Sequence, residues 1–123
     1  MISETEEMMI KRFDDMPDSI REHMRGGAGS VQVKDLLGKD DMAAHCRLFS
    51  MLTIEQGCAI GEHDHCNETE YYWILSGEGI VTEADGDKIV RKGDLVITGG
   101  GASHAIRNEK PEPLVFMALI VLD

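Results

Sequence analysis

Short apolar runs, separated by glycine, aspartate and asparagine, make up the chain from Val31 onward. The runs are rich in valine, isoleucine, threonine and tyrosine, which fit the pleated, half-buried surface of a β-sheet. The predicted strands are residues 31–37, 46–54, 69–75, 79–84, 88–91, 94–98, 104–108 and 114–122. Short strands at such regular spacing predict an all-β sandwich or barrel.

The residues between the runs agree with this fold class. Asp85-Gly86 separates Val81-Thr82 from Ile89-Val90. It predicts a hairpin with a two-residue type I′ turn, because that turn needs the positive φ that glycine adopts without strain. Further corners are expected at single glycines: Gly57, Gly61, Gly77, Gly79 and Gly93. No internal repeat or long linker interrupts the pattern, so we expect one barrel domain at residues 31–123.

Residues 1–30 have a different character. They are charged and rich in methionine, contain Pro17, and end in a glycine-rich stretch at 26–29. Proline at the start of a charged stretch and glycine after it are typical of a short helix followed by a turn. We therefore expect an N-terminal arm over residues 1–30 that is partly helical over residues 17–24.

Charge and composition exclude several classes of partner. The chain has 123 residues and a formal net charge of −11, and only 5% of its residues are aromatic. An acidic chain repels nucleic acid and anionic lipid, and few aromatic side chains are available to stack on bases. The acidic start does not resemble a signal peptide, and no apolar stretch is long enough for a membrane helix. Three cysteines, an odd number without a CxxC pair, suit a reducing compartment, so we expect a cytoplasmic protein.

The candidate chemistry lies in histidines placed among glycines. His63 and His65 are two residues apart, so on a strand they point to the same side, away from Cys66. Glu70 opens the next strand, where alternation places it on one face with Tyr72. Two imidazoles and a carboxylate that converge across a hairpin suit Zn, Fe, Ni, Mn or Cu, with a third imidazole supplied from elsewhere in the barrel.

Two spaced motifs resemble those of the cupins. The first, G-x5-H-x-H-x4-E-x6-G, is matched by Gly57, His63, His65, Glu70 and Gly77. The second, G-x5-P-x-G-x2-H-x3-N, is matched by Gly93, Gly101, His104 and Asn108, with Gly99 in place of proline. The resemblance implies an antiparallel jelly-roll β-barrel. It also implies that one divalent transition metal ion per subunit, Fe, Mn, Ni or Zn, is bound by His63, His65, Glu70 and His104.

Several residues have a second interpretation. Glu68 competes with Glu70 for the carboxylate role, although the spacing to Gly77 favours Glu70. Tyr72 is a candidate proton donor or hydrogen-bond partner of a substrate, but it would also serve as core packing. Glycine instead of proline at position 99 is expected to loosen the turn before His104. An open metal position is expected to face a small cavity lined by Tyr72, Phe49, Met51 and Phe116.

The motifs do not determine the reaction, because one fold hosts many activities. We expect a protein that binds or transforms a small polar or anionic metabolite at the metal. If it is an enzyme, a metal-dependent dioxygenase, isomerase or lyase is expected. The alternative is a non-catalytic binding or sensing module with a structural metal. We also expect a homodimer, with Tyr71 and Trp73 buried by the second subunit and the arm crossing to it.

Overall fold

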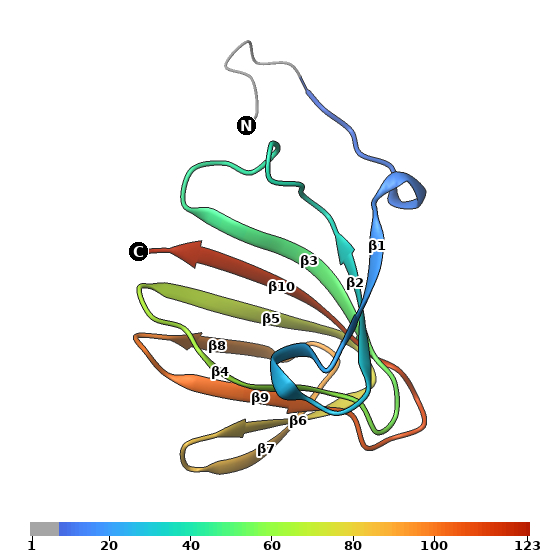
Figure 1. Ribbon diagram of the computed structural model, residues 1–123, viewed down its shortest axis with the longest axis vertical. Coiled ribbons are helices and arrows are strands. Elements are labelled where there is room, and N and C mark those ends of the chain that lie inside the picture. Colours follow the sequence, from blue (N-terminus) through green and yellow to red (C-terminus); the bar gives the residue numbers. More distant parts are fainter. Residues whose placement is uncertain (1–7) are drawn as a thin grey trace.

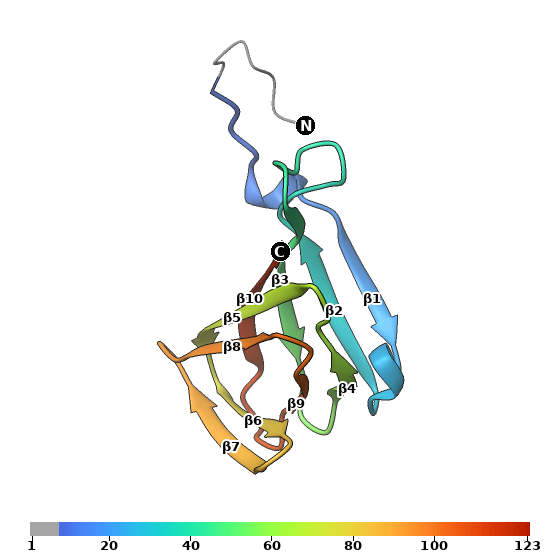
Figure 2. The same ribbon diagram turned by 90° about the vertical axis from the view of Figure 1, so that its left-hand side faces the viewer.

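Two antiparallel sheets form the protein, and the computed structural model describes residues 8–123 (Figure 1). The six-stranded sheet has the order β1 (Asp18–Glu22), β2 (Ser30–Asp35), β3 (Cys46–Ile54), β10 (Leu114–Leu122), β5 (Glu68–Ser76), β8 (Leu95–Gly99). The four-stranded sheet has the order β4 (Ala59–Asp64), β9 (Ser103–Arg107), β6 (Glu78–Glu83), β7 (Gly86–Arg91). Figure 2 shows the two sheets facing each other, which confirms the predicted jelly-roll barrel.

Alternation along the strands supplies the core between the sheets. In β10, every second residue from Leu114 to Ile120 is buried, and β3 alternates in the same way from Ser50 to Ile54. The fully buried apolar side chains come from both sheets and include Val31, Ile54, Ile60, Ile74, Ile106, Leu114 and Phe116. Burying a side chain of this size contributes about 1.5–3 kcal/mol, so these alternating positions stabilise the barrel and fix its registers.

The hairpin at β6–β7 forms, but its turn differs from the predicted one. Glu83 pairs with Gly86, so the two loop residues are Ala84 and Asp85. Gly86 has φ +119°, whereas Ala84 and Asp85 are not among the residues with positive φ. The turn is therefore not type I′. Gly86 is instead the first residue of β7, and its positive φ lets the chain resume pairing with β6 after the turn.

The segment before Val31 is not helical where the sequence suggested a helix. Residues Asp18–Glu22 form β1, which pairs with β2 in the register Asp18↔Lys34 to Glu22↔Ser30. The only helical pieces among residues 8–123 are two 3₁₀ turns, η1 (Phe13–Asp15) and η2 (Met24–Gly26). No helix in the described part of the chain is long and apolar enough to cross a membrane. The first seven residues of the predicted arm lie outside the described residues.

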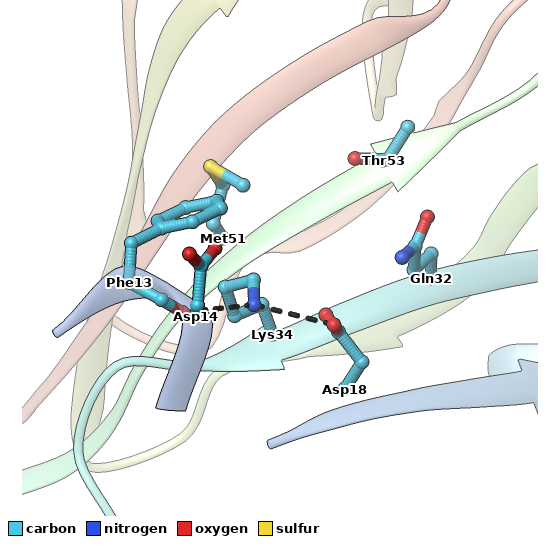
Figure 3. Close-up of a pocket in the computed structure, with 7 residues that line it drawn as sticks. All are labelled: Phe13, Asp14, Asp18, Gln32, Lys34, Met51 and Thr53. Atoms are coloured by element: carbon cyan, nitrogen blue, oxygen red, sulfur yellow. Dashed lines mark hydrogen bonds and ion pairs between the residues drawn. The ribbon is translucent and has the colours of Figure 1, made fainter. Parts of the chain in front are cut away.

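Lys34 explains why this segment lies on the sheet. Its side chain is almost fully buried. Its Nζ donates to the carbonyl oxygen of Phe13 and to the carboxylate of Asp18, both at 3.2 Å (Figure 3). It also donates to the carbonyl oxygen of Met16 at 3.3 Å. The ammonium group also lies 4.3 Å from the centre of the Phe13 ring. A buried ammonium group needs such partners, and here they come from the N-terminal segment. Lys34 therefore ties residues 13–18 to the outer face of the larger sheet.

Candidate metal centre

Three strands bring the predicted ligands to one place inside the barrel. His63 on β4 and His104 on β9 are direct cross-strand partners, and a register shift between Ile60 and His63 sets this pairing. Glu70 lies on β5, and His65 follows the end of β4. One ligand atom from each of these four residues lies within 4.8 Å of every other. The structure therefore brings together the complete predicted set.

The ligand atoms are close to one another and shielded from water. His104 Nε2 lies 3.0 Å from His63 Nε2, 3.1 Å from His65 Nε2 and 3.0 Å from Glu70 Oε1. Glu70 Oε1 is also 2.9 Å from His65 Nε2 and 3.7 Å from His63 Nε2. The four side chains are between 1% and 9% exposed. Such a buried cluster of imidazoles around a carboxylate suits a divalent metal ion.

Each histidine is oriented through its other ring nitrogen. His63 Nδ1 lies 2.8 Å from the carbonyl oxygen of Gly61, His65 Nδ1 lies 2.6 Å from Glu68 Oε2, and His104 Nδ1 lies 2.8 Å from Thr98 Oγ1. Contacts of this kind turn Nε2 toward the metal and are typical of metal-binding histidines. The sequence pattern predicts no role for Thr98. Its place two residues after the buried Val96 on β8 is the signal that could have put it on the inward face.

Electrostatics keeps the carboxylate charged and the tyrosine protonated. Burial alone would raise the pKa of Glu70, but the hydrogen bond with His104 and the nearby imidazoles of His63 and His65 lower it to about 2. Burial, followed by the charge of Glu70, raises the pKa of Tyr72 well above its ordinary value. Burial lowers the pKa of His104, although Glu70 opposes this effect. The cluster thus presents an ionised carboxylate, and burial favours the neutral, metal-binding form of His104.

Tyr72 lies beside the cluster, as its alternation with Glu70 predicts. Its hydroxyl oxygen is 3.4 Å from His104 Nε2, and its ring stacks on that of His104 with centroids 5.0 Å apart. The ring of Phe116 also packs against the Tyr72 ring, with centroids 4.5 Å apart. The prediction that Phe49 and Met51 line this cavity is wrong. The inward positions of β3 are Ser50, Leu52 and Ile54, so Phe49 and Met51 face the other way, and Met51 lies with Lys34 on the opposite face (Figure 3).

Glu68, the alternative carboxylate ligand, and Cys66, the neighbour of His65, lie outside the cluster. Cys66 is exposed, in agreement with its opposite parity. Glu68 contacts His65 through Nδ1 rather than through the metal-facing nitrogen, and both of its oxygens accept hydrogen bonds from Arg47 at 2.9 Å. These bonds from Arg47 are the main reason that the pKa of Glu68 is lowered. Glu68 is therefore a partner of a candidate ligand and not a member of the four-residue set.

The glycine at position 99 has a steric explanation. A Cβ atom there would lie 2.5 Å from Thr69 Oγ1, so the Thr69 side chain occupies the space that another residue would need. Beyond Gly99, the loop pairs with the backbone of His65: the Gly101 amide donates to the His65 carbonyl, and the His65 amide donates to Ala102. The segment in front of His104 therefore also holds His65.

Comparisons with known proteins agree with this geometry. The Cupin domain family matches residues 50–121. The chain is 36% identical over 115 residues to a protein named oxalate-binding protein from Thermotoga maritima, covering 94% of both chains. A crystal structure of a protein from the same organism, described as a predicted oxalate decarboxylase, superposes with a TM-score of 0.88 at 36% identity, over 94% of this chain and 100% of that one.

Two further matches are more distant. A Cupin 2 conserved barrel domain protein from Salinispora arenicola has a TM-score of 0.73 at 19% identity, covering 94% of this chain and 89% of that one, which shows a shared fold. A gentisate 1,2-dioxygenase from a Streptomyces species is 34% identical over 56 residues, which cover 45% of this chain and 15% of that protein. The fold, the four clustered side chains and the matched family together show that this chain belongs to the cupin family.

Proposed function

We propose that the protein binds one divalent transition metal ion per subunit, Fe, Mn, Ni or Zn, through His63, His65, Glu70 and His104. We further propose that this ion holds a small anionic metabolite, and that oxalate or a related dicarboxylate is the class to test first. The observation that carries the proposal is the convergence of three imidazole Nε2 atoms and one carboxylate oxygen at a buried point. Such donors fit a transition metal.

The positions of the imidazole hydrogens also support a cation between the four ligand atoms. The carbonyl of Gly61 and the carboxylate of Glu68 only accept hydrogen bonds, so the neutral rings of His63 and His65 carry their hydrogen on Nδ1. Their Nε2 atoms then present lone pairs, as does the oxygen of Glu70. His104 can supply at most one N–H hydrogen among them. Lone pairs about 3 Å apart repel one another unless a cation lies between them, and a metal ion is such a cation.

The spacing of the donor atoms favours a metal with open positions. A metal about 2.1 Å from each ligand places neighbouring donors about 3.0 Å apart in an octahedral shell and about 3.4 Å apart in a tetrahedral one. Four of the separations given above lie between 2.9 and 3.1 Å, and the fifth, between Glu70 Oε1 and His63 Nε2, is 3.7 Å. An octahedral shell with four protein ligands leaves two positions. These positions suit water or a bidentate anion.

Charge and space support a small anion as the ligand. A divalent ion and the carboxylate of Glu70 sum to a net charge of +1, which attracts anions into a site of low polarity. The barrel registers place Ser50 and Ala118, two small inward-facing residues, in one row with Tyr72. Tyr72 stays protonated at neutral pH because its pKa is raised, so we propose that its hydroxyl donates a hydrogen bond to the ligand.

We place ligand binding ahead of turnover. Within residues 8–123, the polar side chains that contact the candidate ligands are Glu68, Tyr72 and Thr98. Tyr72 and Thr98 are not bases at neutral pH, and Glu68 lies on the Nδ1 side of His65, where Arg47 donates to both of its oxygens. General-base chemistry would need a free base on the side of the ligand atoms. A metal-dependent decarboxylation or oxygenation, or an isomerase or lyase reaction, is the second candidate, because the metal would supply Lewis-acid or redox chemistry at its open positions.

Calorimetry tests the proposal. Oxalate is titrated into chelator-treated protein and into protein loaded in turn with Mn²⁺, Ni²⁺, Fe²⁺ and Zn²⁺, with the His63→Ala/His65→Ala double variant as control. We expect one oxalate per metal-loaded subunit and no binding to the metal-free protein or the double variant. Assays for formate, carbon dioxide and oxygen uptake then separate turnover from binding. Absence of oxalate binding in all four loaded forms would leave only the structural-metal alternative.

We also propose that the protein is a homodimer in the cytoplasm. Trp73, Leu95 and Ile97 are 47%, 50% and 61% exposed, and Trp73 pairs with Leu95 while Tyr71 pairs with Ile97. This apolar patch lies at the β8 edge of the larger sheet and carries no charge. Two copies of a chain with net charge −11 repel each other elsewhere, so an uncharged face is where they would meet. The three free cysteines suit a reducing compartment. A monomer mass by light scattering at micromolar concentration would rule out the dimer.

A further inference from the structure

The three candidate histidine ligands differ in what holds them. His63 and His104 use neutral groups, the Gly61 carbonyl at 2.8 Å and the Thr98 hydroxyl at 2.8 Å. His65 alone is held by a carboxylate, Glu68, at a shorter distance of 2.6 Å. A carboxylate that accepts the Nδ1 hydrogen raises electron density on Nε2 and makes the imidazole a stronger ligand. The three nitrogens are therefore not equivalent toward a metal.

Arg47 fixes this carboxylate in place. Its Nε donates to Glu68 Oε1 and its Nη2 donates to Glu68 Oε2, both at 2.9 Å. This paired geometry constrains the carboxylate plane as well as its position. The two residues come from β3 and β5, which lie on either side of β10. A contact that spans two strands in this way orients Glu68 independently of the short segment between His65 and Glu68.

The burial of Glu68 separates this pair from ordinary surface ion pairs. The side chain of Glu68 is 12% exposed, whereas that of Glu78, which accepts a single bond from Arg91 at 3.1 Å, is 24% exposed. Exposed ion pairs contribute little to stability. Oε2 of Glu68 is shared between Arg47 and His65. The Arg47–Glu68 pair therefore contacts a residue of the candidate metal site, His65, and does more than join two strands at the surface.

We infer that Glu68, held by Arg47, is a positioning residue that fixes the orientation of His65 and strengthens it as a metal ligand. This inference rests on the proposed metal centre. Arg47 has a second effect in this arrangement, because its positive charge balances the negative charge of Glu68. The site keeps a net charge of +1 with the metal bound, so a second carboxylate strengthens His65 without weakening the attraction of an anion.

The test measures Co²⁺ affinity by competition with a chelator in the full chain and in two variants. Glu68→Gln keeps an oxygen that can accept the His65 Nδ1 hydrogen but removes its charge, and we expect about 10- to 100-fold weaker binding. The matched control is Glu78→Gln, which removes a carboxylate from an ion pair on the other sheet and is expected to leave the affinity unchanged.

A spectroscopic readout separates positioning from general destabilisation. Proton NMR of the Co²⁺-loaded protein shows the Nδ1 hydrogens of the bound histidines as shifted, exchangeable signals. In Glu68→Gln we expect the His65 signal to move and those of His63 and His104 to stay. If Glu68→Gln does not fold, Arg47→Met serves in its place, with an expected loss of about threefold to tenfold, because the carboxylate stays but is held less firmly. Arg47→Lys, which keeps the positive charge, should restore part of that loss.

The outcomes separate this inference from the proposed function. If the wild-type protein binds neither Co²⁺ nor any of Mn²⁺, Fe²⁺, Ni²⁺ and Zn²⁺, the metal centre itself is wrong. If the wild-type protein binds one equivalent and Glu68→Gln binds with an affinity within twofold of it, with the His65 signal unmoved, the positioning role is wrong and the metal centre stands. Weaker binding by Glu68→Gln together with a moved His65 signal supports both.

Discussion

Replacing Gly77 by alanine is expected to destabilise the barrel far more than replacing Gly57, although both glycines belong to the first motif. Their backbone conformations are nearly the same, with φ of +82° at Gly77 and +81° at Gly57. Their surroundings differ. A Cβ on Gly77 would lie 2.4 Å from the carbonyl oxygen of Pro113, and a Cβ on Gly57 would meet no atom within 4 Å.

The expected cost follows from these two observations. Alanine in the left-handed region costs about 1 kcal/mol, and this cost is common to both variants. At Gly77 the Pro113–Leu114 backbone must also move by more than half an ångström, since Cβ atoms essentially never approach within 3.0 Å. Forcing such a shift in a packed region adds about 1–3 kcal/mol. We therefore expect losses of about 1 kcal/mol for Gly57→Ala and about 3 kcal/mol for Gly77→Ala.

Urea unfolding of chelator-treated protein measures both losses without a contribution from bound metal. For a domain of this size, a difference of about 2 kcal/mol between the variants also corresponds to a difference in Tm of about 6–10 °C. Equal losses in the two variants would show that the close approach of the β9–β10 loop to Gly77 does not matter. They would refute the steric argument for this glycine and leave backbone conformation as its only role.

Three further predictions concern the N-terminal segment, the protons and the ligand. Lys34→Met should lower the free energy of unfolding by about 1–3 kcal/mol and speed amide hydrogen exchange in β1, while metal affinity stays unchanged. Unaltered exchange in β1 would contradict the argument that Lys34 holds residues 13–18 on the sheet. Metal affinity should hold above pH 7 and fall below about pH 6, because protons then compete with the metal ion for the imidazoles. Since the pKa of His104 is lowered, His104 takes up a proton only at a lower pH than an ordinary histidine. An affinity independent of pH down to 5 would exclude imidazole ligands. Tyr72→Phe should weaken oxalate binding about tenfold in calorimetry with metal affinity unchanged, and an equal oxalate affinity would remove the proposed hydrogen bond.

Most of the barrel strands could be predicted because they bury one face. Burial alternates from Ser50 to Ile54 and from Leu114 to Ile120, and the predicted bounds 46–54 and 114–122 are those of β3 and β10. Strand β4 is not among the predicted strands, and β7, predicted only over residues 88–91, is exposed at five of its six residues. Strand β1 gave no such signal, because all five residues from Asp18 to Glu22 are exposed. Its conformation depends on pairing with β2 and on Lys34, which lies 16 residues from Asp18. Contacts of that range are not visible in a local pattern.

The candidate ligands could be found from parity and motif spacing, but the residues that support them could not. His63 and His65 share a face because side chains alternate, and the motif adds Glu70 and His104. The role of Glu68 depends on Arg47, 21 residues away in the chain and two strands away in the sheet. Which residues meet across strands is set by register, and register emerges only when the sheet is assembled.

Metal stoichiometry tests the central claim most directly. Protein prepared without an affinity tag is treated with a chelator, dialysed against Mn²⁺, Fe²⁺, Ni²⁺ or Zn²⁺, and analysed for bound metal. The His63→Ala/His65→Ala variant is carried through the same steps, and its folding is checked by circular dichroism. The account predicts one equivalent of at least one of these metals per subunit in the wild-type protein and none in the folded double variant. A full equivalent in the double variant, or no bound metal in the wild-type protein with any of the four ions, would contradict it.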